Sequence, residues 1–377
     1  MSKPKPARLL LPLALFFALA QAAAAQAPLD TRRELSQLPD AQAVLFINAR
    51  RIVNEMLPKM MTPAEYRKML ADAQKVGFDA RGLEYVALVG RLAASPAPGD
   101  FPEVAVVVKG NFSADALLAL GRVVAGSQNI RPRSETYGSK TLEIIDLESL
   151  GVKAEAGGEG AGGAQNKSGL PYKELAVTAL DANTLVAGVP SYVRSAVDAA
   201  GGTGALRASL ADLAAHDPNA LWSFTMEMPP NLAEYLRKSG APTNAEADQM
   251  IGWVKQVSLA NGMDALNYTL SAAVLTDAPE HASAFSGMVR MGLLAAQAAL
   301  SQQAAKQTPK DKDYAQTRAG LAALKTFVNR TEGNRLMLSV SVPQKTVADL
   351  VRSEMSKSKT TKAAPRAGRR PGRARRR

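Results

Sequence analysis

The two halves of this 377-residue chain end in the same pattern. In the first half, the apolar stretch Val177–Leu180 is followed by a turn, by the apolar stretch Thr184–Val189, and by a proline. Val328–Thr331, a turn, Arg335–Val342 and another proline repeat this order in the second half. Proline ends a strand because it lacks an amide proton, and its fixed φ suits the first turn of a helix. The repeated pattern therefore predicts two hairpins that each lead into a helix.

The earlier parts of the two halves also correspond. Leu38-Pro39-Asp40 precedes the apolar stretch Ala43–Asn48, and His216-Asp217-Pro218 precedes Ala220–Met226. In each half a helix, two strands and a second helix follow. We therefore predict an α+β fold of two pattern-related β-α-β-β-α-β-like units, with mainly antiparallel sheets and helices packed on one face. The alternative is that any α+β chain shows strands and helices in some matching order.

Two local signals refine this prediction. Thr62-Pro63-Ala64-Glu65 is a capping box with proline at the first helical position, so a helix begins there. Asn261-Gly262 predicts the turn between the strands Val257–Ala260 and Leu266–Leu275, and a long helix over 281–303 follows.

The N-terminus has the layout of a secretory signal peptide. Lys3, Lys5 and Arg8 precede the apolar stretch Leu9–Ala20, which is too short for the about 20 residues of a membrane span. We predict cleavage after Ala25 and export to the periplasm or the extracellular space. The alternative is an uncleaved anchor or a buried helix.

These signals divide the chain into four parts. Residues 1–25 are the signal peptide, 26–205 the first α+β unit with a Gly-rich loop at 154–169, 206–356 the second unit, and 357–377 a disordered basic tail.

The net charge of +12 resides almost entirely in that tail. Its ten cationic residues, with no acid among them, are Lys357, Lys359, Lys362, Arg366, Arg369, Arg370, Arg373, Arg375, Arg376 and Arg377. Such a flexible arm attracts polyanions, and export excludes cytosolic nucleic acid. We expect an anionic envelope polymer or membrane surface as its partner and no nucleic acid. The alternative is a solvating tail without a partner.

The residue inventory argues against most catalytic sites. The chain has no cysteine and only two histidines, His216 and His281, so we expect neither a metal site nor a His-based catalytic pair. A Gly-x-Gly-x-x-Gly match at 158–163 lacks the strand before it and the helix after it that a dinucleotide site needs, so we expect no cofactor. Glu143 and Asp146 would point to opposite faces of one strand. A carboxylate-based hydrolase therefore remains the weakest hypothesis.

The long helix offers an apolar alternative. Phe285, Met288, Val289 and Leu293 could line a groove for a lipid-like ligand beneath the helix 281–303, although residues at this spacing also form ordinary cores.

The segment Leu38–Asn48 follows the pattern L-P-D-x-x-A-V-L-x-x-N. In this segment and the first half around it, the chain resembles a group of uncharacterised exported bacterial proteins of acidobacterial type. The resemblance implies export and the fold, and it implies no catalytic residues. Our leading hypothesis is an exported, non-enzymatic binding or envelope-associated protein of unknown ligand, and the alternative is a carrier of apolar ligands.

Overall fold

The computed structural model describes residues 29–75, 79–92, 102–147, 172–230, 232, 244–308, 311 and 313–351. The predicted signal peptide, the Gly-rich loop at 154–169 and the basic tail with its ten cationic residues lie outside the described residues.

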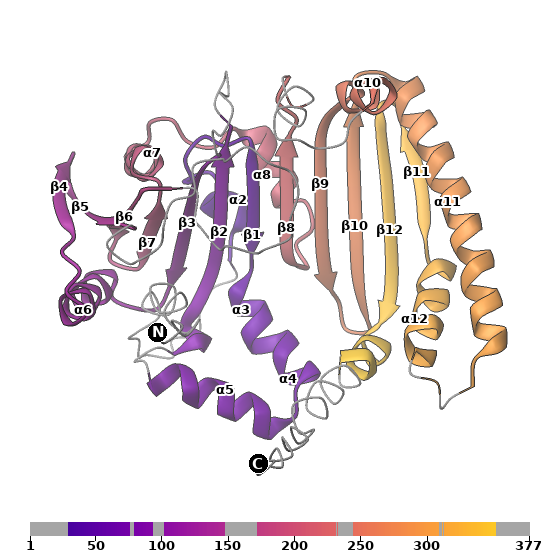
Figure 1. Ribbon diagram of the computed structural model, residues 1–377, viewed down its shortest axis with the longest axis horizontal. Coiled ribbons are helices and arrows are strands. Elements are labelled where there is room, and N and C mark those ends of the chain that lie inside the picture. The colour runs from indigo at the N-terminus through magenta and orange to yellow at the C-terminus, as the bar shows by residue number, and fades with distance from the viewer. Residues whose placement is uncertain are drawn as a thin grey trace, which may run out of the picture.

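The described strands form one antiparallel sheet of twelve, in the order β11-β12-β10-β9-β8-β1-β2-β3-β7-β6-β5-β4 (Figure 1). The strands of the first half are β1 (Ala43–Ile47), β2 (Leu83–Arg91), β3 (Glu103–Gly110), β4 (Arg133–Tyr137), β5 (Lys140–Asp146), β6 (Glu174–Asp181) and β7 (Thr184–Gly188). Those of the second half are β8 (Ala220–Glu227), β9 (Val254–Met263), β10 (Asn267–Thr276), β11 (Val328–Glu332) and β12 (Arg335–Pro343).

The two halves join through β1 and β8, where Leu45 pairs with Phe224. From this pair outward, the first half follows the order β1-β2-β3-β7-β6 and the second half follows β8-β9-β10-β12-β11. The first half then continues with β5 and β4, which have no counterpart among the described strands of the second half. The α+β class and the antiparallel sheet are confirmed, and both units share a single sheet.

Helices connect these strands. They are α2 (Thr31–Leu35), α3 (Ala49–Arg51), the π-helical turn η2 (Ile52–Met56), α4 (Leu57–Met60), α5 (Pro63–Lys75), the 3-10 turn η3 (Ala80–Gly82), α6 (Ala114–Ser127), α7 (Pro190–Ala200), α8 (Ala208–Ala214), α10 (Ala245–Trp253), α11 (Pro279–Lys306) and α12 (Tyr314–Lys325). A final helix over residues 344–351 follows β12 directly.

The sheet has a covered face and an open face. On the covered face, α2, α7 and α8 enclose a core that includes Val44, Ala87 and Val107, each no more than 1% exposed. On the other face, which we call the open face, α6 packs at the first half and α11 at the second, where Ser286 donates to the Asn329 side chain. Helices lie on both faces because the strands carry apolar residues at successive positions, which point to opposite sides of a sheet.

The helix starts follow the predicted local chemistry. Thr62 and Glu65 form the capping box before α5, with the Glu65 amide donating to the Thr62 hydroxyl and the Thr62 amide donating to the Glu65 carboxylate. Pro190 opens α7 after β7, as the repeated Val-Pro pattern predicts.

The predicted turn at Asn261-Gly262 is wrong. β9 runs through both residues to Met263, and the chain turns at 264–266. The Asp264 carboxylate accepts from the amides of Leu266 and Asn267, both at 2.7 Å, and this local side-chain turn reverses the chain. Gly262 lies close to Asp217, since a Cβ there would come within 2.5 Å of the Asp217 carboxylate and that side chain would have to shift.

Two core tyrosines make stability sensitive to alkaline pH. Burial raises the pKa of both Tyr85 and Tyr192, and the nearby Glu34 carboxylate raises that of Tyr85 further. Above pH ~10 these phenols ionise in the unfolded chain but stay neutral in the folded chain. The free energy of unfolding therefore decreases as the pH rises above that value. We expect the free energy of unfolding, measured by urea denaturation, to fall between pH 9.5 and 11 by about 1 kcal/mol or more, and Tyr85→Phe with Tyr192→Phe to flatten that decline. An equally steep decline in the double variant would contradict this assignment.

Candidate binding surfaces

A row of directly paired apolar residues crosses the open face of the sheet. It runs through Val106 of β3, Leu88 of β2, Leu45 of β1, Phe224 of β8 and Leu259 of β9. Leu88 is 39% exposed and the other four are half-buried, whereas the covered-face neighbours of the four residues in β1, β2, β3 and β8 are fully buried. The centre of the open face is thus apolar and only partly covered by the described helices.

The start of α11 is fixed by an aromatic cluster. The His281 ring stacks on Trp253 at 4.0 Å between centroids, and Phe285 meets Trp253 edge-on at 6.0 Å. Nδ1 of His281 lies 2.6 Å from the Asp277 carboxylate, and this hydrogen bond lowers the pKa of Asp277. His281 is therefore a structural residue at the helix start.

The four residues predicted to line a groove under α11 differ in their solvent exposure. Phe285, Val289 and Leu293 are half-buried, whereas Met288 is 39% exposed. Of two cavities in the described part of the chain, one lined by Lys59 and Tyr268 and one by Gln256 and Arg335, neither is lined by any of the four. The groove under α11 stays a prediction.

The outward side of α11 is apolar and exposed. Met291 is 67% exposed and Leu294 62%, and with Met288 they lie within one wide stripe at helical spacing. Between Met291 and Ala305 no side chain is charged. With 28 residues, the helix is about 42 Å long. A helix that is apolar on both sides is normally buried on both sides, so this stripe lacks a cover among the described residues.

A cavity of about 180 Å³ lies between α4, β10 and the final helix. Its walls are Lys59, Met60, Tyr268, Gln344, Lys345 and Ala348. It is near the exposed turn residue Leu266, whose carbonyl accepts from the Gln344 amide. The final helix, from which the chain continues toward the basic tail, starts at this cavity.

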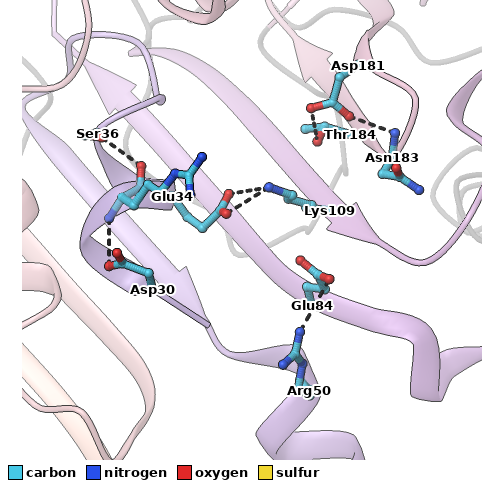
Figure 2. Close-up of polar contacts among 10 residues, drawn as sticks. Asp30, Glu34, Ser36, Arg50, Glu84, Lys109, Asp181, Asn183 and Thr184 are labelled. Carbon is cyan, nitrogen blue, oxygen red and sulfur yellow. Dashed lines mark hydrogen bonds and ion pairs between the residues drawn. The ribbon is translucent and has the colours of Figure 1, made fainter. Parts of the chain in front are cut away.

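A charged cluster lies at one end of β2 and β3 (Figure 2). The Lys109 ammonium lies 2.7 and 2.8 Å from the two Glu34 carboxylate oxygens, and Glu34 also bonds to Tyr85. Asp181 nearby accepts from the Asn183 amide and the Thr184 hydroxyl. The side chains satisfy one another, so this cluster has the character of a structural network.

Other polar residues likewise make structural contacts. Glu143, a candidate carboxylate, is buried and accepts from Arg122 and Ser134, while Asp146 lies at the exposed end of the same strand. In the described ranges, no group of three or more His, Asp or Glu side chains is placed to hold a metal ion. Among those residues, no helix combines the length and apolarity that crossing a bilayer requires.

The sequence analysis did not identify two of these features, the outward stripe of α11 and the cavity. The outward stripe of α11 had a signal, since the segment from Met291 to Ala305 has no charged residue. The cavity had none, because Lys59, Tyr268 and Lys345 are far apart in the chain and each is unremarkable in its own segment.

The chain matches no protein-family model, and no curated protein matches it. Among solved structures it is similar to crystal forms III and IV of TP0453, each at 9% identity and a TM-score of 0.39. The alignment covers 88% of this chain and 100% of that chain for form III, and 84% and 95% for form IV. Crystal form I gives 9% identity and a TM-score of 0.37 over 88% of this chain and 98% of that chain. Likenesses this weak carry no argument about function.

Proposed function

We propose that this protein is an exported, non-enzymatic binding protein that docks on an anionic membrane surface. The outward stripe of α11, with Met288, Met291 and Leu294, enters the lipid interface, and the basic tail binds the anionic headgroups. The observation that carries the proposal is the exposure of these large apolar side chains on a helix that is free of charge from Met291 to Ala305. Exposed apolar patches on a folded surface mark protein or membrane contacts.

The charge of the tail favours an anionic membrane over a protein as the partner that covers the stripe. The tail carries ten cations, and each Lys or Arg near an anionic bilayer contributes about 1 kcal/mol of attraction. Two signals of this kind, one apolar and one electrostatic, together give firm peripheral attachment where either alone is weak.

The arrangement in Figure 1 supports joint action of the two elements. α11 runs beside β11 and β12, so its C-terminal half lies at the same end of the sheet as the end of β12, where the final helix begins. The tail follows that helix in the sequence.

The test is co-sedimentation of the mature chain with vesicles. We expect binding to phosphatidylglycerol-containing vesicles and little binding to pure phosphatidylcholine. Met291→Gln with Leu294→Gln removes two apolar contacts of about 1 kcal/mol or more each, so binding should weaken at least tenfold. Val123→Gln, at a 68% exposed site on α6, is the matched control and should bind as the wild type does.

A truncation after Ser356 tests the electrostatic part. It should remove the salt-sensitive component of binding. The proposal fails if the α11 variant and the truncated chain both bind like the full chain. It also fails if light scattering shows a dimer that the α11 variant dissociates, because the stripe would then be covered by a second copy.

A carrier of apolar ligands is the second candidate, and the half-exposed row from Val106 to Leu259 favours it. Native mass spectrometry of the purified protein would detect a retained lipid. Retention that Phe224→Ser abolishes and the α11 variant leaves intact would support the carrier over membrane docking.

A further inference from the structure

The cavity between α4, β10 and the final helix presents positive charge at its mouth. Lys59 comes from α4 and Lys345 from the final helix, and both side chains are exposed at the rim. Within the described residues, neither lysine forms an ion pair. Its volume of about 180 Å³ is far more than the 10–15 Å³ that one water needs. The cavity can therefore hold an anion larger than a halide.

One residue that lines the cavity, Tyr268, carries a buried donor. Tyr268 is 7% exposed, and its hydroxyl is buried with no hydrogen-bond partner among the described residues. Buried polar groups in folded proteins nearly always have partners, so the unpartnered hydroxyl of Tyr268 indicates a missing acceptor. A phenol donates well to an anionic oxygen.

The cavity also lies at a helix N-terminus. Gln344 and Lys345 are the first residues of the final helix. The Gln344 amide donates to the Leu266 carbonyl, and the amides that follow it in the first turn have no acceptor within the helix. These amides and the helix dipole favour an anion there.

We propose that this cavity binds a phosphate group, with Lys59 and Lys345 neutralising its charge and the Tyr268 hydroxyl and the N-terminal amides of the final helix donating to its oxygens. The phosphate is either that of a lipid headgroup or a free phosphate ester. The lipid source rests on the proposed membrane docking, whereas the phosphate site itself does not.

The test is calorimetric titration of the mature chain with inorganic phosphate and with dihexanoyl-phosphatidylglycerol. Lys59→Gln with Lys345→Gln should weaken binding of both at least tenfold. Tyr268→Phe should weaken it several-fold while leaving the fold intact, because only the hydroxyl is removed. The matched control, Lys173→Gln with Lys325→Gln, changes the net charge equally at exposed sites away from the cavity and should bind as the wild type does.

The outcomes separate this proposal from membrane docking. Tighter binding of the short-chain lipid than of inorganic phosphate assigns the site to a headgroup, and equal binding assigns it to a free phosphate ester. Failure of both compounds to bind, or unchanged binding by the Lys59 and Lys345 variant, overturns the site even if vesicle binding persists. Loss of vesicle binding in the α11 variant with phosphate binding retained shows that the two surfaces act separately.

Discussion

Gly188→Ala is expected to destabilise the protein by about 3 kcal/mol or more. Gly188 pairs with Ala105 of β3 and Ala176 of β6, inside the sheet and beneath α7. A Cβ at this position would lie 2.3 Å from the Val104 carbonyl oxygen and 2.6 Å from the Ala105 Cα. Both atoms belong to the backbone, so relief requires β3 and β7 to move apart, and forced overpacking of this kind is among the larger single-residue costs.

Urea denaturation followed by circular dichroism measures this change. Gly287→Ala is the matched control, since Gly287 lies within α11 and a Cβ there meets nothing within 4 Å. Alanine at that site should stabilise the helix by about 0.5–1 kcal/mol. A Gly188→Ala protein with an unchanged midpoint would show that the β3–β7 contact is looser than described.

Lys109→Met is expected to cost about 2–4 kcal/mol. Its ammonium is the partner of Glu34, whose side chain is only 12% exposed (Figure 2). Removing one member of a buried ion pair leaves the other charge uncompensated, which costs more than the pair itself contributes. Methionine is apolar and similar in length to the lysine stem. The loss of stability therefore reflects mainly the removal of the charge.

A double-mutant cycle separates the charge from the packing. Glu34→Leu with Lys109→Met should recover most of the loss, because no uncompensated carboxylate remains. Lys68→Met is the control, since the Lys68–Asp72 pair has side chains 75% and 44% exposed and should change stability by less than about 0.5 kcal/mol. A double variant as unstable as Lys109→Met alone would refute the electrostatic explanation.

The local features of the chain were predictable because their causes are local. The capping box at Thr62 and Glu65 and the Val-Pro corners at 189–190 and 342–343 each involve groups within a few residues of one another. The turn at Asn261-Gly262 was wrong because turn propensity was read without tertiary context. Asp264 offered a competing local turn, and Gly262 lies close to Asp217.

The candidate sites divide in the same way. Phe285, Met288, Val289 and Leu293 were assigned to one groove, but the side of α11 that meets the sheet depends on distant partners such as Asn329 and Trp253. The basic tail remains a prediction from charge alone. The cavity of Lys59, Tyr268 and Lys345 depends on contacts between elements more than two hundred residues apart in the chain.

By itself, the amino-acid sequence determined the repeated order of strands and helices, the α+β class and the separation of a near-neutral body from a cationic tail. These follow from side-chain periodicity, turn chemistry and charge, which act over short stretches or are simple sums. Only the tertiary structure decided that Leu45 pairs with Phe224 and fuses both units into one sheet, that helices cover both faces, and that α11 keeps an apolar side uncovered. Strand partners and solvent exposure are set by contacts between residues remote in sequence, and no local pattern specifies which of several compatible surfaces will meet.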